Sequence, residues 1–237
     1  MLKLILGLTV SNSCAFDPSS FNLITLPWKV WNIWGSPSAG PTWFQLYWEP
    51  CVQCCNRERI GKIGDGGKWV CIGNVRQNPV LISVGSNNEF SFESSILKKY
   101  PAAIVNTYDH TSYPSDDPKI HFHKTMMTPD LLFSLVRNSQ EPIDILKVDC
   151  EGCEYDLFSN HILLKKLCAM NTQILIEVHW SKLGQQKMAI LWEKFTIAGF
   201  GPFHKEPNIQ WTDGSCVEYS LKPIPTATCL KRHWKLH

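Results

Sequence analysis

The chain of 237 residues lacks any apolar stretch long enough for a membrane-spanning helix, which needs about 20 residues. It also lacks an extended run of basic residues and an acidic tail, and its formal net charge at pH 7 is only +2. Nucleic acids and other partners recognised mainly by charge are therefore not expected, and no membrane span is expected.

Two glycine-rich phosphate-binding motifs are missing as well. The turn "SVGSNNEFSFE" at residues 83–93 has Gly85 alone and is not a GxGxxG fingerprint. The segment "RERIGKIGDGGKWVC" at residues 57–71 is rich in glycine but lacks the spacing of a P-loop. Its glycines allow either an anion-binding turn or a purely structural one.

Cysteine, by contrast, is abundant, with ten residues in the chain. The start "MLKLILGLTVSNSCA", residues 1–15, is similar to a compact secretory signal peptide, although a buried N-terminal strand or helix is the alternative. A signal would place the protein outside the cell or in the secretory lumen. There Cys71 is expected to form a disulfide with Cys51, Cys54 or Cys55. The cytoplasm is the alternative location.

The remaining sequence divides into two parts. Residues 16–50 are rich in tryptophan and broken by prolines, which indicates an irregular extension. Trp28, Trp31 and Trp34 have helical spacing, which favours an apolar cover for the core over a carbohydrate-binding platform. Residues 51–237 form the expected main domain.

The main domain alternates short apolar runs with longer helical stretches, a pattern typical of α/β proteins. The expected strands lack strict alternation, as in a mostly parallel, Rossmann-like sheet with helices on both faces. They are "VLISV", "AAIVNTY", "KIHFH", "DILKVD", "QILIEVHW" and "VEYSLKP", and the expected helices include "SFESSILKKY", "TPDLLFSLVRN" and "QQKMAILWEKFTIAGF".

Ligands of such sheets bind beyond the carboxyl ends of the strands. The first expected strand ends at the Gly85 turn, and Asp109 follows the second strand at a separation of about twenty residues, which suits an acidic side chain that binds a ribose diol.

The motifs "VLISVGSNNEFSFE", "IVNTYDHT", "IDILKVDCEGCEYDLF" and "ILIEVHW" together resemble methyltransferases of the FkbM type that use S-adenosylmethionine. The upstream "RIGKIGDGGKWVC" resembles an element of the animal methyltransferase-like branch. The resemblance implies S-adenosylmethionine as cofactor and a small-molecule or glycan acceptor. It also implies a set of cofactor contacts: Gly85, Asn87, Glu93 and Asp109, with Asp65, Lys68 and Trp69 on the upstream loop.

The stretch "KVDCEGCEY" is the most specific part of the resemblance. Asp149 and Glu151 are expected at the reacting edge, and His179 is the candidate base for a hydroxyl acceptor, with nitrogen as the less favoured acceptor. Cys150 and Cys153 form a CxxC, but no second metal-binding pair lies nearby. We therefore expect these two cysteines to be apolar filler and expect no metal site.

Two other functions stay open from the sequence. A secreted or luminal binding protein could keep this fold without turnover, which the single glycine of the cofactor turn and the many cysteines would suit. A zinc- or thiol-based protein depends on the cysteines alone. Fold does not decide between these functions, and the sequence does not indicate the oligomeric state.

Overall fold

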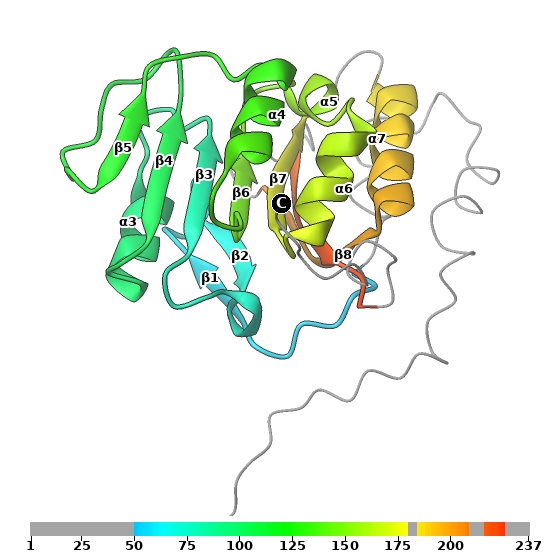
Figure 1. Cartoon of the computed structure of the whole chain (residues 1–237), viewed down its shortest axis with the longest axis horizontal. Coiled ribbons are helices and arrows are strands. Elements are labelled where there is room, and N and C mark those ends of the chain that lie inside the picture. The colour runs from blue at the N-terminus through cyan, green and yellow to red at the C-terminus, as the bar shows by residue number, and fades with distance from the viewer. Residues whose placement is uncertain (1–49, 180–183, 209–215, 226–237) are drawn as a thin grey trace, which may run out of the picture.

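A seven-stranded sheet organises the computed structural model, which describes residues 50–179, 184–208 and 216–225 (Figure 1). The predicted signal peptide and nearly all of the Trp-rich extension lie outside these residues. The strands, in chain order, are β3 (Val80–Val84), β4 (Ile104–Tyr108), β5 (Ile120–His123), β6 (Ile145–Val148), β7 (Gln173–His179), β8 (Phe200–Pro207) and β9 (Cys216–Pro223).

The strand order across the sheet is β5-β4-β3-β6-β7-β9-β8. The five strands β3 to β7 pair in parallel, and β9 pairs antiparallel with both β7 and β8. The first five strands follow the Rossmann order, which reverses between β3 and β6. The predicted mostly parallel Rossmann-like sheet is therefore confirmed, although β8 was not predicted.

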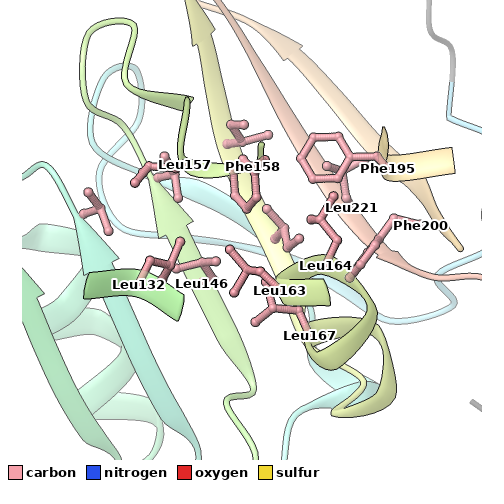
Figure 2. Packing of buried hydrophobic residues seen from close by; sticks show 14 of the residues in the cluster. Leu132, Leu146, Leu157, Phe158, Leu163, Leu164, Leu167, Phe195, Phe200 and Leu221 are labelled. Atoms are coloured by element: carbon pink, nitrogen blue, oxygen red, sulfur yellow. The ribbon is translucent and has the colours of Figure 1, made fainter. Parts of the chain in front are cut away.

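One face of the sheet, here called the helical face, is covered by α4 to α7 (Figure 1). These helices are α4 (Pro129–Asn138), α5 (Glu154–Leu157), α6 (His161–Ala169) and α7 (Gly184–Ala198). Figure 2 shows how their leucine and phenylalanine side chains pack onto strand residues such as Leu146 and Leu221, all of them buried. Burial of such side chains provides the main driving force for folding.

The opposite face, here called the hairpin face, is covered differently. Helix α3 (Ser91–Lys99) packs there together with an antiparallel hairpin of β1 (Arg57–Ile60) and β2 (Lys68–Cys71). A short 3-10 turn, η2 (Ile72–Asn74), follows β2. The prediction of helices on both faces is thus confirmed by α3, and the hairpin covers β7 and β9 on the same face.

Local signals explain several of these elements. Thr128 caps α4, because its hydroxyl accepts a hydrogen bond from the amide of Leu131 at 3.2 Å, and Pro129 is tolerated in the first turn. Asn160 caps α6 in the same manner. Within the described ranges, no helix combines the length and the apolar character needed to cross a membrane.

Candidate functional site

On the hairpin face, the side chains of β6 and β7 change from apolar to polar toward the carboxyl ends of the strands. Near the middle of the sheet it presents apolar side chains such as Leu175, which belongs to the core under the hairpin. Because side chains alternate between faces, Glu177 and His179 share the face of Leu175, and Asp149 shares the face of Lys147. Polar groups therefore gather on this face at the carboxyl ends of the strands, the edge where ligands of such sheets bind.

Lys68 of β2 lies over this polar edge and is almost entirely buried, at 2% exposed. Its ammonium donates to Asp149 at 2.9 Å and also pairs with Glu218 of β9. Burial by itself lowers the pKa of Lys68, but Asp149, Glu218 and Glu177 outweigh it and hold the pKa above its usual value. Lys68 is therefore a permanent cation that joins the hairpin to the sheet.

The carboxyl groups around Lys68 differ in their proton affinity. Burial and the neighbouring carboxylates raise the pKa of Glu177 to about 8 and that of Glu218 to about 7. Burial also disfavours the charge of Asp149, yet Lys68, Lys147 and a hydrogen bond from Glu177 lower its pKa below the usual range. Asp149 is thus ionised and Glu177 mostly protonated at neutral pH.

His179, the predicted base, lies among carboxylates. Its ring nitrogens are 3.4 Å from Glu154, 3.4 Å from Glu151 and 3.7 Å from Glu177. Burial lowers the pKa of His179, but these carboxylates outweigh it and raise the pKa to about 9. His179 is therefore mostly protonated at neutral pH, which does not suit the predicted base, because an imidazolium has no lone pair with which to accept a proton.

The start of α5 fixes the end of β7. Glu154 is fully buried and accepts hydrogen bonds from the amides of Gly152 at 2.9 Å and His179 at 2.8 Å. The Tyr155 hydroxyl donates to the carbonyl of His179 at 2.6 Å. The second glutamate of "DCEGCEY" therefore has a structural role that the sequence analysis did not assign.

Glu151 stands clear of the sheet, with 86% of its side chain exposed and a left-handed φ of 56°. The neighbouring Cys150 and Cys153 form a disulfide across this turn. The prediction that they are filler is therefore wrong, because their side chains approach closely enough to bond. A second disulfide joins Cys54 to Cys71, one of the three pairings predicted for Cys71.

Asp109, predicted to bind ribose, is surrounded by donors of its own chain. One carboxylate oxygen accepts from the amides of Ser86 and Asn87 and from the hydroxyls of Ser86 and Ser112. The other accepts from the amide and hydroxyl of Thr111 and the amide of Ser112. Burial opposes the charge, but these hydrogen bonds lower the pKa of Asp109 below its usual range. Asp109 joins the turns after β3 and β4.

Gly85 and Glu93 also support the turn after β3. Gly85 has a φ of 79°, and a Cβ there would meet the carbonyl oxygen of Asp149 at 1.6 Å, so no other residue fits. Its own carbonyl accepts from Lys147 at 2.7 Å. Glu93 is fully buried and accepts from Ser83, so its predicted cofactor contact does not match its position. Asn87 is exposed on the turn.

The predicted upstream loop does lie over the turn after β3. The Lys62 amide donates to the hydroxyl of Ser91 at 3.0 Å, at the start of α3. A carboxylate oxygen of Asp65 lies within 4.8 Å of those of Asp149 and Glu177. Trp69 lies elsewhere, since its ring contacts His204, with the centroids 4.5 Å apart. Asp65 and Lys68, but not Trp69, are therefore brought to the polar edge.

Glu177, Glu218 and Lys147 were missed by the sequence analysis. Glu177 could have been found, because it lies two residues before His179 in "IEVHW" and therefore on the same face of a strand. Glu218 could not, since its pairing with Glu177 depends on the antiparallel β9.

The family model of a methyltransferase domain matches residues 30–222 of the chain. No curated protein matches the sequence.

Three solved structures resemble the chain at low identity. The Methanococcus jannaschii fibrillarin, a pre-rRNA processing protein, has a TM-score of 0.43 at 11% identity, over 72% of this chain and 84% of that one. A Burkholderia thailandensis 1,6-didemethyltoxoflavin N1-methyltransferase has 0.38 at 13%, over 62% and 72%. An N-methyltransferase from Bradyrhizobium japonicum has 0.38 at 9%, over 62% and 86%. These values are too low to support a conclusion about substrate or mechanism.

Proposed function

Because this chain belongs to the family of methyltransferase domains, we propose that it transfers the methyl group of S-adenosylmethionine to a hydroxyl of a small-molecule or glycan acceptor. Within the family we assign it to the FkbM type, on the strength of "KVDCEGCEY" and the motifs around it. The methyl group of this cofactor is activated by a sulfonium, so alignment with the nucleophile carries much of the catalysis.

The residues at the carboxyl edge fit this cofactor in charge and position. Asp65 and Asp149 carry carboxylates that suit the cationic methionyl part. Asn87 lies on the turn after β3, where nucleotides bind in Rossmann-like sheets. Asp109 would hold the ribose hydroxyls in place of the hydroxyl donors Thr111 and Ser112.

The Lys68–Asp149 pair is the observation that favours a hydroxyl acceptor. A hydroxyl can donate to the ionised Asp149 and at the same time accept from the ammonium of Lys68, whose nitrogen lies 2.9 Å from the same carboxylate. An amine has a single lone pair, which must attack the methyl group and so cannot also accept from Lys68. In this arrangement Asp149 orients the acceptor and takes its proton as the oxygen bonds to the methyl carbon, and Lys68 stabilises the oxygen while that proton leaves.

Calorimetric titration with S-adenosylmethionine and with S-adenosylhomocysteine tests the cofactor assignment. Labelled methyl transfer to matched panels of hydroxyl and amine acceptors then tests the acceptor class. We expect hydroxyl products and at least a tenfold loss of transfer in Asp149→Asn, which keeps the shape but removes the charge. Amine products alone would overturn the hydroxyl assignment, and cofactor binding without any transfer would favour the non-enzymatic binding protein.

We further propose that the protein works in an oxidising compartment, secreted or in the secretory lumen. The support comes from the disulfides Cys54–Cys71 and Cys150–Cys153 and from the disulfide-bonded states of Cys55 and Cys168. Mass spectrometry of non-reduced protein from secreting cells tests this. An intact Met1 with reduced cysteines would place the protein in the cytoplasm.

A further inference from the structure

We propose that Glu177, His179 and Cys216 bind a divalent transition-metal ion of the zinc type on the hairpin face, beside Asp149. From the sequence we expected no metal site, because the CxxC of residues 150–153 has no second metal-binding pair nearby. The three residues come together through strand pairing: His179 and Cys216 are direct partners across β7 and β9, and Glu177 shares the face of His179.

The distances suit one ion. One ligand atom from each of the three residues lies within 4.8 Å of the others. The imidazole Nε2 of His179 is 3.7 Å from the Oε2 of Glu177. Two ligands on a tetrahedral zinc ion, with bonds of about 2.0 to 2.3 Å, lie roughly 3.3 to 3.8 Å apart. Small side-chain shifts therefore bring all three atoms to coordinating distance.

The surroundings orient these ligands as in known metal sites. A metal-binding histidine usually donates a hydrogen bond from its second ring N–H to a carboxylate or carbonyl. Carboxylates that bind the metal are hydrogen-bonded as well. Nδ1 of His179 lies 3.4 Å from a carboxylate oxygen of the buried Glu154, which would accept its N–H when Nε2 binds a metal. The other oxygen of Glu177 accepts from the amide of Asn208 at 2.9 Å. Both ligands thus have a partner that directs them.

Charge also favours a cation at this position. Lys68 is paired with Asp149 and Glu218, and it faces Glu177 as a third carboxyl group, so a further cation would offset the remaining negative charge. A thiolate, an imidazole and one carboxylate select zinc and related ions over Mg²⁺ or Ca²⁺, which prefer oxygen ligands alone.

The fourth coordination position faces the reacting edge. The Glu151 carboxylate lies 3.4 Å from Nε2 of His179 on the exposed turn, and either this carboxylate or an acceptor oxygen can complete the site. A metal-bound hydroxyl is more acidic than a free one. This consequence rests on the proposed function, whereas metal binding does not.

Titration of metal-free protein with Co²⁺, followed by competition with Zn²⁺, tests the site directly. We expect one equivalent of Co²⁺ to bind with the near-ultraviolet absorption of a cobalt–thiolate bond. Cys216→Ser should abolish that absorption, and Glu177→Gln and His179→Asn should each weaken binding at least tenfold. Cys51→Ser is the matched control, because Cys51 is a free thiol away from the cluster and its change should leave the spectrum intact.

Thermal unfolding of each variant confirms that it is folded. Wild-type protein that binds no Co²⁺, or binding equal in wild type and Cys216→Ser, would overturn the proposal. The outcome is separable from the proposed function, because cofactor titration and methyl transfer are measured on the same samples. Metal binding without transfer contradicts only the function, and transfer by protein that binds no metal contradicts only the metal site.

Discussion

The two halves of the carboxyl edge hold their acidic side chains in opposite ways. In the half formed by β3 and β4, Asp109 is enclosed by backbone amides and hydroxyls that lower its pKa. In the half formed by β6, β7 and β9, Glu177 is buried among other carboxylates, and burial together with their negative charge raises its pKa to about 8. Hydrogen bonds to the charged form and repulsion from like charges explain the difference.

This difference indicates separate roles. A carboxylate whose oxygens accept from its own chain shapes a turn, so Asp109 holds the cofactor loops together, and in the proposed function the ribose hydroxyls replace two of its hydroxyl donors. Carboxylates crowded together at a cost to stability mark a functional site, since neutralising them is left to protons or to a bound cation. The Glu177 half is where we place acceptor and metal.

The largest effect is expected when the cation of the second half is removed. Lys68→Met leaves Asp149 and Glu218 without their buried partner and should lower the free energy of unfolding by roughly 3 to 5 kcal/mol in urea denaturation. Lys99→Met, which breaks a surface pair with Glu58, should cost less than about 1 kcal/mol. Equal losses would show that the Lys68 cluster is not a buried electrostatic unit.

The second-largest loss of stability is expected when the charge of Asp109, in the half formed by β3 and β4, is removed. Asp109→Asn disrupts hydrogen bonds to an ionised acceptor and should cost about 3 kcal/mol, with at least tenfold weaker cofactor binding. Asp117→Asn is the control, because the Asp117 carboxylate accepts a hydrogen bond from the backbone amide of Lys119 in an exposed turn. A stable variant with normal cofactor affinity would contradict the scaffold role.

The pH dependence of that variant provides a second measurement. The pKa of Asp109 is lower in the folded protein than its ordinary value of 3.8. Its contribution to stability is therefore present above pH 3.8 and is lost as the pH falls through the folded-state pKa. Wild type should lose more stability than Asp109→Asn between about pH 4 and pH 2, and parallel curves would refute this.

The two disulfides allow a further comparison, between the hairpin and the turn after β6. Cys54–Cys71 spans 17 positions and Cys150–Cys153 only 3. By loop-closure entropy, replacing each pair with alanine should cost about 3 and about 2 kcal/mol, respectively. The smaller loss should be accompanied by changed activity, because the second disulfide constrains the turn that carries Glu151. Thermal unfolding and methyl transfer on both variants decide this.

The smallest effect on stability is expected at Glu151. Glu151→Gln removes one charge from an exposed side chain and should leave the unfolding midpoint unchanged while lowering methyl transfer about tenfold. Asp156→Asn, also exposed and on the adjacent α5, is the matched control and should change neither quantity. Full activity in Glu151→Gln would remove this residue from the reacting edge.

The sequence predicted much of the fold because its signals are local. Apolar runs identified the parallel strands, and the segment "TPDLLFSLVRN" identified α4, which Thr128 caps. The hairpin of β1 and β2 was missed, since polar residues such as Arg57 and Glu58 dominate its first strand. Strand β8 was missed for a similar reason, because its Gly201 and Pro202 are uncommon within strands.

The sequence by itself placed Asp109, Asp149, Glu151 and His179 at the carboxyl edge, because strand ends and the two-residue alternation of side chains are properties of the local chain. Only the tertiary structure decided what each of them does. Proton affinity and hydrogen bonding depend on neighbours up to 150 positions away, as for Lys68 and Glu218. These contacts arise when β2 and β9 pack against β7, which no local pattern specifies.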